Sequence, residues 1–103
     1  MKTIAEQLNI KDFPFKIKDK LGNEIYHENS FGYWVKQEYD SKDNKTYFED
    51  SDGYWYKREY DSKGNQIYYE NSDGYWAKQE YDSNGKETYF ENSSGDWYKR
   101  EYD

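Results

Sequence analysis

The chain has 103 residues and a formal net charge of −7, from 15 basic and 22 acidic residues. Hydrophobic residues make up 33% and aromatic residues 22%, so at most one domain with a thin core of rings is expected. The acidic balance argues against direct nucleic-acid binding, which needs clustered Lys and Arg. The absence of cysteine excludes disulfides and thiolate metal sites, and we expect neither metal nor cofactor. No apolar run suits a signal peptide or a membrane span, so we expect a cytoplasmic protein without membrane contacts.

Residues 1–21 are predicted to form an N-terminal cap. Thr3-x-x-Glu6 is a capping box, which predicts a short helix over residues 3–9. Residues 13–19 align with residues 34–40 and resemble half of a repeat, so they predict a first strand with Pro14 on an edge. A helix and a proline-containing edge strand are typical of the closed end of a repeat array.

Four copies of a 21-residue repeat follow this cap, at residues 22–42, 43–63, 64–84 and 85–103. Nine columns are identical in all four copies; in the first copy they are Tyr26, Glu28, Ser30, Gly32, Trp34, Lys36, Glu38, Tyr39 and Asp40. Such a period indicates one supersecondary unit repeated along an axis.

Each repeat predicts two strands and two tight turns. Residues 24–28 and 33–39 are rich in β-formers, whereas residues 29–32 and 40–43 are turn clusters. The second turn ends in Gly in two copies and in Asp43 in another, as a position with positive φ requires. The fold class is therefore predicted to be all-β, an antiparallel meander of tandem hairpins with about nine strands and a short helical cap.

The strand register follows if Glu28 faces Tyr33 across the first turn and Asp40 faces Asn44 across the second. In that register Glu38 would face Thr46. One face would hold Ile25, His27, Trp34, Lys36 and Glu38, and the other would hold Tyr26, Glu28, Tyr33, Val35, Gln37 and Tyr39. Neither face would be wholly apolar.

Isolated polar residues have structural interpretations. His27, the only histidine, occupies a column of aromatic rings and is predicted to pack against Trp34 rather than to act as a base. Glu28 and Glu38 would lie on opposite faces and could not flank one glycosidic bond, so no enzyme activity is expected. Residues 50–53 resemble the start of a calcium loop but lack its bidentate Glu and its length, which favours a simple turn.

The repeat resembles tandem β-hairpin families of bacteria and phages. The Tyr-Asp-Ser-x-Gly runs at 60–65 and 81–85 are similar to the YD-type repeats of Rhs proteins, and Asp-Gly-Tyr-Trp at 52–55 and 73–76 is similar to MORN-like hairpins. Small phage and prophage proteins built from Glu-Asn-Ser-x-Gly-Tyr-Trp units are also similar over residues 13–103. These resemblances imply a hairpin fold and a mobile-element origin.

Two sets of side chains are candidates for binding. Aromatic rows recur once per hairpin and are expected to build the core, or alternatively to stack on a ligand: Tyr26, Trp34, Tyr47, Trp55, Tyr68, Trp76, Tyr89 and Trp97. Acidic rows on a rigid frame would complement a basic partner: Glu28, Glu38, Asp40, Glu49, Asp52, Glu59, Asp61, Glu70, Asp73, Glu80 and Asp82.

These patterns lead to a functional hypothesis. We expect a non-enzymatic protein-binding module, in its most specific form a phage-encoded acidic inhibitor that occludes the basic, nucleic-acid-binding surface of a host defence protein. The alternatives are a glycan- or ligand-binding module that uses the aromatic rows, and a structural protein that forms homo-oligomers through its C-terminal edge strand.

Overall fold

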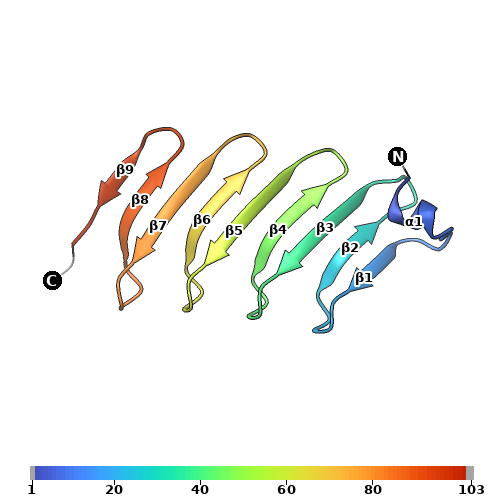
Figure 1. Ribbon diagram of the computed structural model, residues 1–103, viewed down its shortest axis with the longest axis horizontal. Coiled ribbons are helices and arrows are strands. Elements are labelled where there is room, and N and C mark those ends of the chain that lie inside the picture. Colours follow the sequence, from blue (N-terminus) through green and yellow to red (C-terminus); the bar gives the residue numbers. More distant parts are fainter. Residues whose placement is uncertain (1, 102–103) are drawn as a thin grey trace. The chain divides into compact units, whose positions relative to one another are not determined.

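The structure is a computed structural model that describes residues 2–101 (Figure 1). Within these residues it contains helix α1 (Ile4–Gln7) and nine strands that follow chain order. The strands are β1 (Phe15–Lys18), β2 (Glu24–Glu28), β3 (Trp34–Tyr39), β4 (Lys45–Asp50), β5 (Trp55–Tyr60), β6 (Gln66–Asn71), β7 (Trp76–Tyr81), β8 (Glu87–Asn92) and β9 (Trp97–Lys99). The predicted all-β meander is therefore confirmed, although the last two residues of the fourth repeat lie outside the described part.

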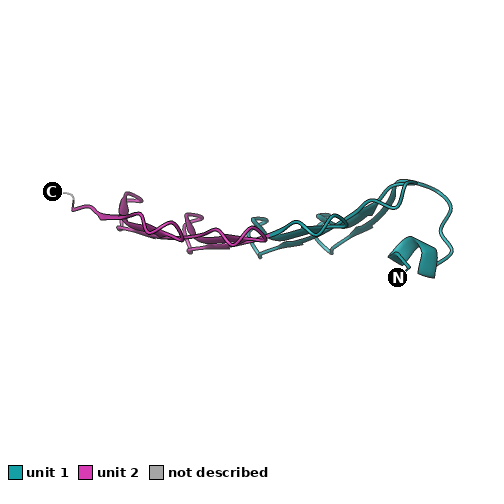
Figure 2. Ribbon diagram, turned by 90° about the horizontal axis from the view of Figure 1, so that it is seen from above, with its two compact units in different colours: residues 1–55 teal, residues 56–103 magenta. Residues whose placement is uncertain are grey.

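The chain forms two compact units, Met1–Trp55 and Tyr56–Asp103 (Figure 2). Unit 1 contains α1 and strands β1 to β4, and unit 2 contains strands β6 to β9 and β5 from Tyr56 onward. The strands of each unit form a single layer, and α1 folds back over one face of the unit 1 sheet (Figure 2). The boundary between the units falls within the second repeat.

Both turns of a repeat are three-residue loops with the same backbone geometry. In the first turn the Gly32 amide donates to the Asn29 carbonyl at 3.2 Å, and Gly32 has a φ of 88°. In the second turn the Asp43 amide donates to the Asp40 carbonyl at 3.1 Å, and Asp43 has a φ of 64°. A type I turn followed by a left-handed residue is a common hairpin connection. The predicted need for Gly or Asp at this position is confirmed.

The N-terminal elements are shorter than predicted. Thr3 caps α1, and its hydroxyl accepts the Glu6 amide at 3.1 Å, so the predicted helix start is confirmed. The helix ends at Gln7 rather than at residue 9. Strand β1 begins at Phe15, because Pro14 has no amide hydrogen to donate to the ladder.

The predicted register across the first turn is wrong by one residue. The Asn29 amide donates to the Tyr33 carbonyl at 3.0 Å, so the three-residue loop makes these two residues face each other. Glu28 consequently pairs with Trp34 instead of Tyr33. Because side chains alternate along a strand, this shift places the side chains of β3 on the face opposite to the one predicted from their partners in β2.

The second turn begins as predicted, but a β-bulge then changes the pairing. The Asp40 amide donates to the Asn44 carbonyl at 2.9 Å. A register shift directly after Glu38 adds one residue to the partner strand, so Glu38 pairs with Tyr47 rather than with Thr46. Unit 2 has the same irregularities at the equivalent positions of β5 and β7. Bulges of this kind cannot be read from a strict two-residue alternation.

The true register gathers the repeated Tyr, Glu, Trp and Lys columns on one face, which we call the Tyr–Glu face. In unit 1, Tyr26 pairs with Lys36 and Glu28 pairs with Trp34. Glu38 shares this face because it lies two residues beyond Lys36 on the same strand. The predicted division of these five residues between two faces is therefore wrong.

The opposite face carries His27, Val35 and Gln37. His27 pairs with Val35, and its Nδ1 atom lies 3.7 Å from a carboxylate oxygen of Glu24. The predicted contact between His27 and Trp34 is wrong, because the two side chains lie on different faces.

Very little of the chain forms a core. Among the described residues, the buried ones are Ala5, Tyr26, Glu28, Gln37 and Ala77. Other rings pack in cross-strand pairs on the opposite face, including Tyr56 with Tyr69 at 6.0 Å and Phe90 with Tyr98 at 5.3 Å between ring centroids. Each unit is thus held mainly by its ladders, its turns and such side-chain pairs.

Candidate functional site

A tyrosine-to-glutamate hydrogen bond recurs on the Tyr–Glu face of every repeat. The hydroxyl of each tyrosine donates to the glutamate two residues further along the strand. The pairs are Tyr26–Glu28 at 2.8 Å, Tyr47–Glu49 at 2.9 Å, Tyr68–Glu70 at 3.1 Å and Tyr89–Glu91 at 2.9 Å. The sequence prediction missed this bond, although the identical Tyr-x-Glu columns were its signal.

The first of these pairs lies beneath helix α1. The Thr3 hydroxyl donates to Glu28 Oε2 at 2.6 Å, and the Ala5 amide donates to Glu28 Oε1 at 3.1 Å. Glu28 is 2% exposed and Tyr26 is 4% exposed. Three donors therefore satisfy one buried carboxylate, and the two from Thr3 and Ala5 hold α1 against the sheet.

The surroundings of this pair fix its protonation. Burial disfavours the charged form of Glu28, but hydrogen bonds from Thr3, Tyr26 and Ala5 outweigh burial and hold its pKa below the usual value. Burial, together with the neighbouring Glu28, raises the pKa of Tyr26 to about 12. At neutral pH the pair consists of an anionic glutamate and a neutral tyrosine donor.

The other three pairs are only partly buried. Burial and the bonded glutamate raise the pKa of Tyr47 and of Tyr68, and the bond to its glutamate raises that of Tyr89. In each pair the tyrosine hydroxyl donates its hydrogen bond to the Oε1 atom of the glutamate. Within the described chain, no donor comparable to Thr3 contacts the second oxygen of these glutamates.

A tryptophan and a lysine complete the pattern beside the Tyr–Glu pair. Lys36 Nζ lies 5.2 Å from the ring centroid of Trp34, and Lys78 Nζ lies 5.4 Å from that of Trp76. Both distances allow a cation–π interaction. Trp34 and Trp76 are half-buried, whereas Trp97 is 64% exposed. The tryptophan columns thus cover the sheet surface and do not enter an interior.

The predicted acidic row divides into three groups. The first group accepts backbone amides in the turns: Asp40 Oδ1, for example, accepts the amides of Lys42 and Asn44, both at 2.9 Å. Hydrogen bonds from the Asn44 and Asn65 amides lower the pKa of Asp40 and of Asp61. This group consists of Asp40, Asp61 and Asp82. These side chains stabilise hairpins.

The second group, Glu28, Glu49 and Glu70, receives the tyrosine hydroxyls described above. The third group is exposed and consists of Glu38, Glu59 and Glu80 on the Tyr–Glu face, with Asp52 and Asp73 in turns. The carboxylates of this third group are therefore the ones that a partner can reach directly.

Glu28 and Glu38 lie on the same face, which contradicts the sequence prediction. Trp34 faces Glu28, and Glu38 lies four residues beyond Trp34 on strand β3. At roughly 3.3 Å per residue the two glutamates are about 13 Å apart along the strand direction alone. Glycosidase carboxylates lie roughly 5 to 9.5 Å apart, so this pair still does not flank one bond.

The turn at residues 50–53 uses its acidic side chain internally. Asp50 Oδ1 accepts the Asp52 amide at 2.9 Å and the Tyr54 amide at 3.2 Å. The interpretation of this segment as a turn is confirmed. Across residues 2–101, no group of three or more histidine or acidic side chains is arranged to hold a metal ion.

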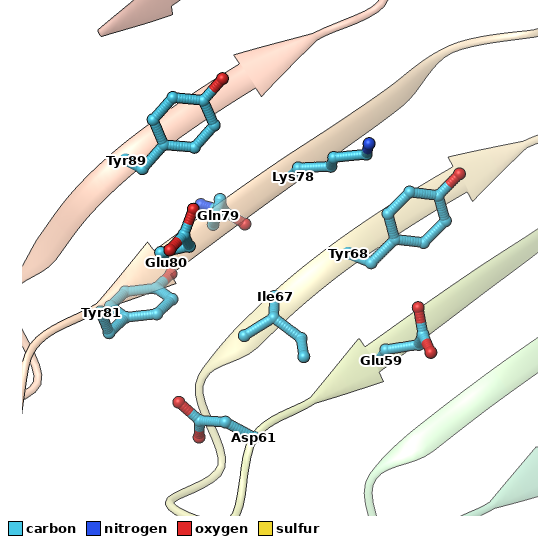
Figure 3. Close-up of a pocket in the computed structure, with 9 residues that line it drawn as sticks. All are labelled: Glu59, Asp61, Ile67, Tyr68, Lys78, Gln79, Glu80, Tyr81 and Tyr89. Carbon is cyan, nitrogen blue, oxygen red and sulfur yellow. The ribbon is translucent and has the colours of Figure 1, made fainter. Parts of the chain in front are cut away.

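Unit 2 has a shallow hollow of about 500 Å³ on its Tyr–Glu face (Figure 3). Its lining residues are Glu59, Asp61, Ile67, Tyr68, Lys78, Gln79, Glu80, Tyr81 and Tyr89. The rings of Tyr68 and Tyr89 lie on either side of strand β7, which carries Lys78 and Glu80 (Figure 3). The hollow therefore combines flat aromatic surface with hydrogen-bonding groups of both charges.

Comparisons with known proteins do not assign this chain to a family. No protein-family model matches it, and no curated protein matches it either. In the part of the chain that the structure describes, no helix has the length and apolar character needed to cross a membrane.

Proposed function

We propose that this chain is a non-enzymatic, cytoplasmic protein-binding module whose partner presents a basic surface. The observation that carries the proposal is the exposed carboxylate that recurs on the Tyr–Glu face as Glu38, Glu59 and Glu80. None of these three side chains is used in a turn or in a tyrosine pair. Each of the first three repeats therefore presents one accessible carboxylate on the face that also carries its tyrosine-bonded glutamate.

The surrounding charge supports a basic partner. The net charge of −7 attracts cationic surfaces over a distance, which raises association rates and disfavours acidic partners. Asp52 and Asp73 add exposed charge in the turns. The lysines of this face do not cancel the charge, because each repeat pairs one lysine with two glutamates on it.

In its most specific form, the proposal is that a phage-encoded inhibitor occludes the basic, nucleic-acid-binding surface of a host defence protein. Acidity and the resemblance of the repeat to phage proteins support this form. Partner binding would then be mutually exclusive with nucleic-acid binding, because both ligands would use the same cationic surface.

Retention of host proteins on the immobilised chain, with and without nucleic-acid competitor, tests this proposal. We expect basic proteins to be retained at low salt. They should be released by 0.5 M salt, because charges are then screened over roughly 4 Å. Added DNA or RNA should also release them. The triple variant E38Q/E59Q/E80Q should lose retention.

The matched control, E6Q/D12N/D96N, removes the same charge from exposed carboxylates outside these columns and should retain the partner. Equal loss in both variants would show that only net charge matters. Retention that persists at high salt would contradict an electrostatic partner.

The hollow in unit 2 favours glycan binding as a second candidate. Tyrosine rings can stack on sugar faces, and the nearby Glu80 and Lys78 can bind hydroxyl groups. A glycan array should then show binding that Y68A or Y89A abolishes. The control Y75A removes a ring that packs with Tyr69 on the opposite face. An array without hits for the wild-type chain would contradict this candidate.

A further inference from the structure

Helix α1 rests on four side chains of the first repeat, which we call a helix seat: Tyr26, Glu28, Trp34 and Lys36. The Glu28 carboxylate receives the Thr3 hydroxyl and the Ala5 amide. A small space of about 120 Å³ between α1 and the sheet is lined by Tyr26, Trp34 and Lys36 from the seat. The seat thus recognises a helical turn that begins with a hydroxyl residue.

The third residue of the recognised segment must be small. Ala5 is completely buried, and its amide lies 3.1 Å from Glu28 Oε1. A larger side chain at this position would hold the helical turn away from the sheet and break the hydrogen bond. The recognition element is therefore a hydroxyl residue at the helix N-cap with alanine or glycine two residues later.

Unit 2 contains the same seat twice in the same register. Tyr68 pairs with Lys78 and Glu70 pairs with Trp76, as their counterparts do in unit 1. The fourth repeat repeats this arrangement, because Tyr89 pairs with Lys99 and Glu91 pairs with Trp97. The tyrosine hydroxyl again binds the glutamate in both seats.

Both seats in unit 2 are open. Glu70 and Glu91 are only partly buried, in contrast to the 2% exposure of Glu28. Their tyrosine bonds already orient the carboxylates, so little side-chain entropy remains to be lost on binding. An ionised carboxylate can only accept hydrogen bonds, so its ligand must bring donors.

We propose that the two open seats bind hydroxyl-capped helical turns of a partner protein, in the way that the first seat binds α1. This inference rests on the proposed protein-binding function and names the segment that is recognised. The partner's Ser or Thr hydroxyl and the amide two residues later donate to Glu70 or to Glu91.

The α1 helix of a second copy is a poorer occupant than a separate partner. Each chain has one α1, and its own first seat holds it intramolecularly at high effective concentration. Transfer of α1 to another copy would empty one seat for each seat that it filled. A partner segment fills a seat without this loss.

The closing experiment uses an acetylated, amidated peptide of residues 2–11 as the probe and the ¹⁵N-labelled full chain as the receptor. At millimolar peptide we expect amide shifts at Tyr68–Glu70 and at Tyr89–Glu91. E70Q should weaken binding at the first of these seats about tenfold and leave the second unchanged, since a charge-assisted hydrogen bond is lost. E91Q should give the reciprocal result.

Two changed peptides test the chemistry of recognition. A peptide with Val in place of Thr3 lacks the hydroxyl, and one with Leu in place of Ala5 is too large; both should fail to bind. Equal binding of either peptide, or unchanged shifts in E70Q and E91Q, would overturn the proposal. Y68F, which keeps Glu70 but loses its orienting bond, should weaken the seat less than E70Q does.

A tethered version keeps the test decisive if the free peptide binds weakly. Residues 2–11 joined to the C-terminus through a flexible linker should shift the Tyr89–Glu91 amides, and the Val-for-Thr3 version should not. Absence of this difference would also overturn the proposal. Loss of seat binding with intact salt-sensitive retention of basic proteins would refute only this inference, whereas the reverse result would refute only the electrostatic function.

Discussion

The hydroxyl of Tyr26 lies 2.8 Å from the Glu28 carboxylate, and both side chains are buried beneath helix α1. The same bond between Tyr68 and Glu70 lies on a partly exposed surface. One chain therefore contains the same pair in a covered and in an open environment. Each substitution in the first pair has a matched control in the third repeat.

The covered glutamate should contribute more to stability than the open one. E28Q removes the negative charge that accepts the Thr3 hydroxyl and the Ala5 amide. We expect the free energy of unfolding to fall by about 1 to 3 kcal/mol, as is typical when a buried, charge-assisted bond is lost. The matched E70Q variant should lose less than about 1 kcal/mol. Urea unfolding followed by tryptophan fluorescence measures both, and equal losses would show that α1 does not depend on Glu28.

Acid should release α1 selectively. The folded chain holds the pKa of Glu28 below its ordinary value of 4.5, so the bonded carboxylate stabilises the fold above that pH. This stability is lost as the pH falls through the lower, folded pKa. Amide shifts of Ala5 should therefore titrate below pH 4.5. E28Q should flatten this titration. An Ala5 amide shift that titrates at the ordinary glutamate value of 4.5 in both the wild type and E28Q would contradict the prediction.

High pH should disturb the same pair by ionising Tyr26. Burial, with help from Glu28, raises the pKa of Tyr26 from 10.0 to about 12. The neutral tyrosine therefore stabilises the fold fully below pH 10, and this contribution is lost as the pH rises through about 12. Ring-carbon NMR shifts should show Tyr26 ionising later than an unperturbed tyrosine. In E28Q its pKa should move down.

Positive φ angles in the turns should decide which substitutions are tolerated. Gly64 has a φ of 86°, and an added Cβ would meet no atom within 4 Å. The cost of G64A is thus confined to the backbone, and we expect about 1 kcal/mol of destabilisation. G64D should cost less, because Asp43 already adopts a φ of 64° at the same place in the preceding repeat. Thermal unfolding of the two variants compares them directly, and equal stability would contradict this reasoning.

The turns and the helix cap could be predicted because their determinants are local. Thr3 and Glu6 specify the start of α1, and Asp43 and Gly64 occupy a position whose backbone geometry few residues accept. These features depend on neighbours within four residues. A repeated sequence then multiplies each local signal.

The register and the site could not be predicted in the same way. The three-residue loop shifts the pairing of Glu28 by one residue, from Tyr33 to Trp34. The bulge after Glu38 then shifts the pairing with the next strand by one more residue. Each shift transfers side chains to the other face, so a small error in pairing concealed the Tyr–Glu face. The position of α1 over Glu28 joins residues more than 20 positions apart, which the periodicity does not encode.

The near absence of a shared interior has a consequence for inheritance. Each repeat brings its own turns and its own tyrosine-to-glutamate bond, so neighbouring repeats do not depend on one jointly packed core. A recombination event that inserts or deletes 21 codons would add or remove one complete seat and leave the others intact. Copy number in the gene would then set the valency of the protein, and lineages could adjust avidity by unequal crossing-over without changing a single contact residue.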